Sequence, residues 1–187
     1  FAETVNSILQ KCGPCTHGKL CKLIYLVDRY HVVRYGRPVV GGNYNALPKG
    51  PIPSVALDVF EDFEAAQLEE PGAPQSSASL VDHLGNYLTV STTARYPEYS
   101  AKPINEYRYL SESDREAIDN VVEKYGKYTF WELVALTHQH IAWKDTPQPR
   151  AIDYRLFYLD EPGAQDSAKE YLELFQDERK AAEALGG

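Results

Sequence analysis

The spacing of apolar residues predicts two helices at the start of the chain. In the first, apolar side chains recur at the three- and four-residue intervals of one helix face until Gly13-Pro14 breaks the pattern. The second runs from about His17 to about Arg34, with Thr16 in the N-cap position. The positions expected to face inward are Val5, Ile8, Leu9 and Cys12 in the first helix, and Leu20, Leu23, Ile24, Val27 and His31 in the second.

Capping residues predict four further helices. Ser54 is placed to begin one that ends before Pro71-Gly72, and Asp166 or Ser167 begins the last, at about 166–185. The two helices between them start with capping boxes, Ser111 with Asp114 and Thr129 with Glu132. The inward-facing residues of the four are Leu57, Phe60 and Phe63; Ile118, Val121, Val122 and Tyr125; Phe130, Leu133, Val134 and Thr137; and Tyr171, Leu172, Phe175 and Leu185.

One segment gives a clear β-strand signal. Gly85-Asn86 separates two apolar runs, and a glycine in the first position of a two-residue turn is typical of a type II′ hairpin. The pattern as a whole therefore predicts a mainly α (α+β) fold, a compact helical domain of about six helices with one small β-hairpin near residues 79–92, and a single domain over residues 1–187.

The remaining segments are predicted to be loops or short irregular pieces. Glycine and proline are frequent after the second helix, which favours a structured loop there. These segments are 36–53 (a structured loop), 71–79 (a loop within the domain), 94–110 (irregular) and 151–159 (a short strand or a helical turn).

Composition is that of one soluble globular domain: 187 residues, 43% apolar, and a net charge of −8. A chain of this length buries roughly 70% of its unfolded surface, so it needs no disulfides. It has no run of roughly 18 apolar residues, which excludes a membrane span, and no signal-peptide pattern. We therefore expect a cytoplasmic protein without a membrane partner.

Charge is unevenly spread along the chain. Residues 1–60 hold seven basic and three acidic residues, a net +4, which leaves −12 for the remainder. We expect an electrically two-sided molecule whose N-terminal third meets an acidic or polar partner. Without a dense Lys/Arg run, nucleic-acid binding is not favoured. The acidic last helix is either a solvated face or an arm that forms a homo-oligomer.

Cys12-Gly13-Pro14-Cys15 matches the sequence of the thioredoxin-type redox motif, but the surrounding sequence differs from that of a thioredoxin. A helix precedes it, no β-α-β pattern surrounds it, and no Trp stands before Cys12. We therefore interpret it as two thiols at a helix–helix junction. Cys12, Cys15, His17 and Cys21 are also candidate zinc ligands, although Cys15 and His17 are too close in sequence for paired ligands. We therefore predict that the protein has neither a metal nor another cofactor.

Polar residues near the end of the second helix admit a catalytic and a structural interpretation. Asp28, Arg29 and His31 lie together, but the chain has no nucleophile motif, so we favour a polar cluster that fixes the turn into the following loop. His138 and His140 would point about 200° apart on a helix and share no ligand. The chain is therefore predicted not to be an enzyme. Its fourteen tyrosines suit either an interface or the core rim.

Several runs carry a resemblance to a known family. They are KLCKLIYLVDRYHVVRYGRP, followed by Tyr44, Ala46 and GPIPS; LSESDREAIDNVVEKYG; and WELVALTH followed by Trp143. Their order and spacing over most of residues 2–145 resemble the Panacea domain, the SocA-like antitoxin domain found in phage-associated GepA-type proteins. The matching positions include the motif residues Lys19, Lys22, Tyr25, Asp28, His31, Gly36, Pro38, Gly50 and Pro51.

The resemblance implies a non-catalytic antitoxin of a bacterial or prophage toxin–antitoxin system that binds its cognate toxin. Two alternatives stay open: an adaptor that delivers the toxin to a ClpXP-type protease, and a zinc- or thiol-dependent domain using Cys12, Cys15 and Cys21. We expect toxin contacts from the second helix, the loop after it and the helix carrying Trp131. The expected partner-binding residues are Arg29, Tyr35, Arg37, Tyr44, Lys49, His138 and Trp143.

Overall fold

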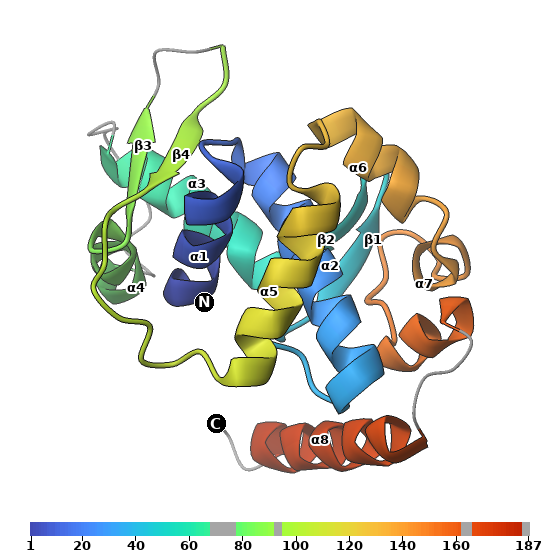
Figure 1. Ribbon diagram of the computed structural model, residues 1–187. Helices are drawn as coiled ribbons and strands as arrows, with labels where there is room; N and C mark the ends of the chain where they lie inside the picture. The colour runs from blue at the N-terminus through green and yellow to red at the C-terminus, as the bar shows by residue number, and fades with distance from the viewer. Residues whose placement is uncertain (68–77, 92–94, 162–165, 185–187) are drawn as a thin grey trace.

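The long helix α2 (His17–Tyr35) occupies the centre of the fold (Figure 1). It contacts α1, α3, α5, α6, α8, β2 and the 3-10 helix η1. Twelve of its nineteen residues are buried, because other elements cover it on several sides. The computed structural model describes residues 1–67, 78–91, 95–161 and 166–184, and no helix in these ranges is long and apolar enough to cross a membrane.

The other elements follow in chain order. Helices and strands are α1 (Ala2–Cys12), β1 (Tyr44–Leu47), β2 (Gly50–Pro53), α3 (Ser54–Gln67), α4 (Ala78–Gly85), β3 (Leu88–Ser91), β4 (Glu98–Ala101), α5 (Glu112–Tyr125), α6 (Phe130–Thr137), α7 (Ile141–Lys144), η1 (Tyr154–Asp160) and α8 (Asp166–Ala184). The mainly helical α+β fold class is confirmed, with more short helices than predicted in the described part of the chain.

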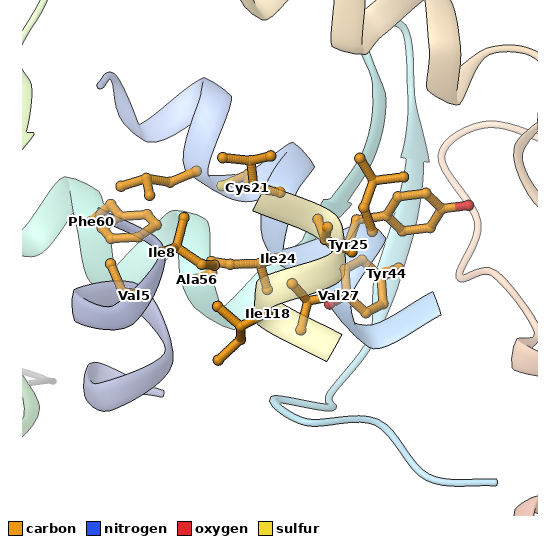
Figure 2. Close-up of a cluster of buried hydrophobic side chains, with 14 of the residues drawn as sticks. Val5, Ile8, Cys21, Ile24, Tyr25, Val27, Tyr44, Ala56, Phe60 and Ile118 are labelled. Atoms are coloured by element: carbon orange, nitrogen blue, oxygen red, sulfur yellow. The ribbon is translucent and has the colours of Figure 1, made fainter. Parts of the chain in front are cut away.

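The core lies where α1, α3 and α5 meet α2 (Figure 2). Each helix contributes residues at the spacing that places them on one face, such as Val5 and Ile8 of α1. Toward β1 the core turns aromatic, because the rings of Tyr25 and Tyr44 meet edge to face with centroids 5.4 Å apart. Most of the apolar positions predicted from periodicity are buried here.

Capping boxes fix the starts of two helices as predicted. The Ser111 hydroxyl accepts from the Asp114 N–H while the Asp114 carboxylate accepts from the Ser111 N–H, and Thr129 and Glu132 repeat this exchange at α6. The segment 151–159 overlaps η1 (Tyr154–Asp160), which agrees with the helical-turn alternative.

Helix α8 begins at Asp166, one of its two predicted starts, but its buried face differs from the prediction in part. Leu172 is buried, whereas Tyr171 is 63% exposed, so the predicted inward position of Tyr171 is wrong. Ala168 takes its place on the buried side. Leu185 lies outside the described residues.

The predicted hairpin near residues 79–92 is wrong in its first half. Its first run forms α4, because Val81 and Leu84 are buried at helical spacing. Gly85-Asn86 ends this helix. The second run does supply β3, but β3 pairs antiparallel with β4, inside the segment 94–110 that was predicted irregular.

The Gly/Pro-rich segment 36–53, predicted as a loop, contains an antiparallel hairpin. β1 pairs with β2 from Tyr44 opposite Pro53 to Leu47 opposite Gly50. Proline at positions 51 and 53 concealed the strand, because proline has no N–H to donate and is confined to edge strands such as these. The hairpin packs on α2 and α6 through β2.

Helix α8 crosses one end of the molecule at Gly36, the C-cap of α2 (Figure 1). Gly36 has a positive φ of 75°, and a Cβ there would overlap the Ala168 carbonyl oxygen and Tyr171 Cβ of α8. Only a glycine satisfies both the left-handed backbone and this close approach.

Gly36→Ala is therefore expected to lower the free energy of unfolding and to release α8. The positive φ alone costs about 1–2 kcal/mol. Gly41→Ala is the matched control, since Gly41 also has a positive φ (78°) but its Cβ would meet only the Pro38 ring, at 3.3 Å. Urea unfolding and limited proteolysis read out the two effects. Equal losses in both variants, with no faster cleavage at α8, would contradict the packing role of Gly36.

Candidate functional site

The carboxylate of Asp28 ties the loop after α2 back to that helix. Asp28 is fully buried and accepts four hydrogen bonds of 2.8 Å, from the N–H groups of Val39, Val40 and Gly41 and from the Tyr44 hydroxyl. Burial raises the pKa of Asp28, and the four donors act against that rise. This arrangement supports the polar-cluster interpretation, because the protein's own donors occupy the carboxylate oxygens.

His31 fixes the same loop one helical turn further on. Its Nδ1 lies 2.7 Å from the Arg37 carbonyl oxygen and its Nε2 3.0 Å from the Ser113 hydroxyl. Burial lowers the pKa of His31, which favours the neutral ring. Arg37 in turn donates to Asp114 of α5 at 2.8 Å. Loop, α2 and α5 are thereby joined.

Two residues predicted to bind a partner are instead buried. Tyr44 is fully buried against Asp28. Arg29 is 8% exposed and donates to Glu161 at 2.8 Å. Their toxin contacts stay predictions, and in this structure both side chains have partners inside the protein. Sequence did not reveal this, because the acidic partner of Arg29 lies 132 residues away.

Two others, Tyr35 and Arg37, lie at the C-terminal end of α2 and are half-buried. The Tyr35 hydroxyl donates to Glu116 at 2.5 Å, and Arg37 forms an ion pair with Asp114. Both side chains already have partners on α5. The seven residues predicted to bind a partner therefore lie in three places: the interior, the C-terminal end of α2, and the β1–β2 hairpin.

The last three, Lys49, His138 and Trp143, lie around the tip of the β1–β2 hairpin. Trp143 donates its Nε1–H to the Leu47 carbonyl at 2.9 Å, and the His138 ring stacks on Trp143 with centroids 3.8 Å apart. Lys49 Nζ lies 6.0 Å from the ring centroid of Trp131, which is 65% exposed. We call the surface formed by Lys49, Phe130, Trp131, His138 and Trp143 the hairpin-tip patch.

A hollow of about 320 Å³ adjoins this patch. It is lined by Thr16, His17, Gly18, Lys49, Tyr96, Pro97, Phe130 and Trp131. Tyr96 and Phe130 were not among the expected partner residues. For Trp131 a signal existed, because it lies off the apolar stripe of α6 and is therefore expected to face solvent. Tyr96 lies far away in sequence, so no local pattern places it here.

A buried lysine supports the hairpin from beneath. Lys22 is fully buried, and its ammonium donates to the Pro51 carbonyl at 2.8 Å. Burial lowers the pKa of Lys22 to about 8. Gly50 allows this approach, since a Cβ there would lie 2.7 Å from the Thr137 hydroxyl and 3.2 Å from Lys22 Nζ. The motif residues Lys22, Gly50 and Pro51 therefore form one contact.

The candidate histidines and thiols occupy separate places. His138 stacks on Trp143, whereas His140 lies 3.1 Å from the Tyr25 hydroxyl. The two do not lie on one helix as assumed, because His138 caps the end of α6 and His140 precedes α7. His17 lies 2.9 Å from Glu64. Within the described ranges no group of three or more His, Cys, Asp or Glu side chains is arranged to hold a metal ion, so Cys12, Cys15, His17 and Cys21 form no such set.

Most of the basic side chains in the N-terminal third have interaction partners within the protein itself. Lys11 pairs with Asp119 and Arg34 with Glu116, and Arg29 and Arg37 pair with acidic residues as described above. Lys22 is buried, and Lys19 donates to the Gly126 carbonyl at 2.7 Å. The two-sided charge distribution stays a prediction, but folding places carboxylates of the acidic remainder beside four of the seven cations.

A family model described as "Antitoxin SocA-like, Panacea domain" matches residues 20–144 of the chain. The matched range includes Asp28, Lys22 and the whole hairpin-tip patch. No curated protein and no solved structure matches the chain.

Asp28→Asn is expected to destabilise the fold by about 2–4 kcal/mol. An asparagine keeps one acceptor oxygen, and its amide N–H groups would face donors from the loop or Tyr44. Asp58→Asn is the control, because Asp58 is exposed on α3. Urea unfolding measures both. A loss within about 0.5 kcal/mol for Asp28→Asn, the range of ordinary surface substitutions, would disprove the anchoring role.

His140 predicts a specific pH dependence of stability. Burial lowers its pKa to about 3, whereas an unfolded-chain histidine titrates near about 6.5. The unfolded state therefore binds more protons between these values, and the free energy of unfolding falls as the pH drops through that window. Replacing His140 with Gln should weaken the fall between about pH 7 and pH 5 by about 1–2 kcal/mol. His83→Gln, at an exposed position, should leave it unchanged; identical curves for both variants would refute this.

Proposed function

Because the chain belongs to the SocA-like antitoxin family that carries the Panacea domain, we propose that it neutralises a cognate toxin by direct, non-catalytic binding through the hairpin-tip patch. The toxin partner is made in the same cell, so the complex forms in the cytoplasm. The binding mode and the location rest on this proposal, whereas family membership rests on the match over residues 20–144.

The observation that carries the proposal is the exposed aromatic surface at the hairpin tip. Trp131 is 65% exposed and stands beside Lys49 and the hollow that Tyr96 and Phe130 line. Tryptophan and tyrosine dominate the binding energy of protein interfaces, because they bury a large rigid surface at low entropic cost. The hollow gives an apolar side chain of the toxin a place to insert.

The patch is also held rigidly, which favours binding. The hairpin strand β2 is fixed to α2 by Lys22, and β1 is fixed to α7 by the bond from Trp143 to Leu47. Stacking on Trp143 orients His138. A preorganised surface loses little conformational entropy on association, so more of the contact energy appears as affinity.

Trp131→Ala and Lys49→Glu are expected to weaken toxin binding without unfolding the protein. Truncation of a central interface tryptophan costs at least about 2 kcal/mol, or about 30-fold in Kd. Tyr109→Ala is the control, because Tyr109 is 80% exposed but lies outside the patch. Calorimetric titration with the product of the neighbouring gene measures Kd, and co-expression measures rescue of growth.

Several outcomes would overturn the proposal. The antitoxin function fails if the neighbouring gene product is harmless alone or stays toxic beside the unaltered protein. The assigned surface fails if Tyr109→Ala weakens binding as much as Trp131→Ala. An adaptor delivering toxin to a ClpXP-type protease would be recognised by toxin that disappears in cells with the protease and persists without it, instead of accumulating as an inactive complex.

A further inference from the structure

The Cys12-Gly13-Pro14-Cys15 segment places one accessible and one buried thiol at the junction of α1 and α2. Cys12 is the last residue of α1 and is half-buried, whereas Cys15 is buried. Two backbone hydrogen bonds pair Cys15 with Tyr99 of β4, at 3.1 and 2.9 Å. The position of Cys15 is therefore fixed, while Cys12 retains a path to solvent.

Cys12 opens into a surface hollow of about 730 Å³. The hollow is lined by Lys11, Cys12, Lys19, Asp119, Val122, Glu123, Gly126 and Lys127. A reagent of about the size of a tripeptide has room to reach the sulfur. Three lysines against two carboxylates leave an excess of positive charge, which favours an anionic sulfur and anionic reagents.

The pKa values of the two thiols are shifted in opposite directions. The neighbouring Cys15 thiol, together with the charge of Lys19, lowers the pKa of Cys12 to about 7 against the opposing effect of burial. The neighbouring Cys12 and burial both raise the pKa of Cys15. The accessible sulfur of Cys12 therefore ionises more readily than the buried sulfur of Cys15.

We propose that Cys12 and Cys15 form a reversible dithiol site that reacts with small-molecule disulfides of the glutathione class. Cys12 is the attacking thiol and Cys15 the resolving thiol. This proposal does not rest on toxin binding by the hairpin-tip patch, although Thr16 and His17, which follow Cys15, line the hollow beside that patch. The site differs from a thioredoxin site in its setting, since Cys12 ends a helix instead of beginning one, and a neighbouring thiol and a lysine supply the stabilisation of its thiolate.

The reaction balances as thiol–disulfide exchange. The Cys12 thiolate attacks one sulfur of the small disulfide, forming a mixed disulfide and releasing one small thiolate. Loss of the negative charge on Cys12 removes one of the influences that raise the pKa of Cys15, which makes ionisation of Cys15 easier. The Cys15 sulfur then displaces the second small thiol. The protein loses two electrons and two protons, and two small thiols carry them away.

Cys21 provides an internal control. It is buried on α2, and burial raises the pKa of its thiol to about 12. A thiol with this pKa and no access to solvent is inert. Reaction confined to Cys12 and Cys15 therefore distinguishes a built site from general oxidation of the chain.

The first test uses the unaltered full chain. Reduced protein is equilibrated near about pH 7 with mixtures of oxidised and reduced glutathione, quenched with acid, alkylated, and analysed by intact mass and peptide mapping. We expect one disulfide that joins Cys12 to Cys15, reversed by dithiothreitol, with Cys21 free. No disulfide at any mixture, or a stable glutathione adduct on Cys12, would overturn the proposal.

The second test measures how fast Cys12 reacts with iodoacetamide as the pH is raised. The midpoint is expected near 7 for the unaltered protein. In Cys15→Ala it should move toward the ordinary thiol value of about 8.5, which lowers the rate near pH 7 about tenfold. Cys21→Ala should leave the midpoint unchanged. An ordinary midpoint in the unaltered protein overturns the proposal even if Cys15→Ala fails to fold.

Discussion

The buried carboxylate of Asp28 is the constraint on which the arrangement after α2 depends. A charge inside a protein is costly unless donors surround it, and here three consecutive backbone N–H groups and one hydroxyl do so. Those donors belong to the loop that leads into β1. The start of the hairpin is therefore determined by a side chain on α2, and the hairpin carries Lys49 at its tip. Lys22 plays the corresponding part at the other strand of the hairpin, where its buried ammonium group donates a hydrogen bond to the Pro51 carbonyl of β2.

Much of the helical framework was predictable, because its determinants are local. A capping box such as Ser111 with Asp114 lies within four residues, and an apolar stripe repeats within two turns. The hairpins were not predictable, since their pairing joins residues across a turn and proline hid one strand. The candidate site was likewise predictable only in part. Sequence singled out Asp28 and His31 as a polar cluster, but it gave no sign that Tyr44 would be the hydroxyl donor to it.

The distribution of charge along a sequence does not by itself give the distribution of charge on the folded surface. Seven cations in the first 60 residues suggest a basic surface, yet Arg29, Arg37, Arg34 and Lys11 meet carboxylates from later segments. In the described ranges, Lys49 differs from these four in that it faces the Trp131 ring instead of a carboxylate. Exposed ion pairs such as Lys11 with Asp119 contribute little to stability, but they do cancel the long-range field.

These ion pairs bear on the kind of toxin surface that we expect to bind the protein. With four of its seven cations paired to carboxylates, the N-terminal third is expected to steer a toxin only weakly, so that affinity would come mainly from contact. The hairpin-tip patch combines an exposed tryptophan, an apolar hollow and one lysine. A toxin that binds there as we propose would offer an apolar side chain to fill the hollow and a carboxylate for Lys49. An interface of this kind is expected to depend mainly on buried aromatic area, and so its affinity should change little with ionic strength.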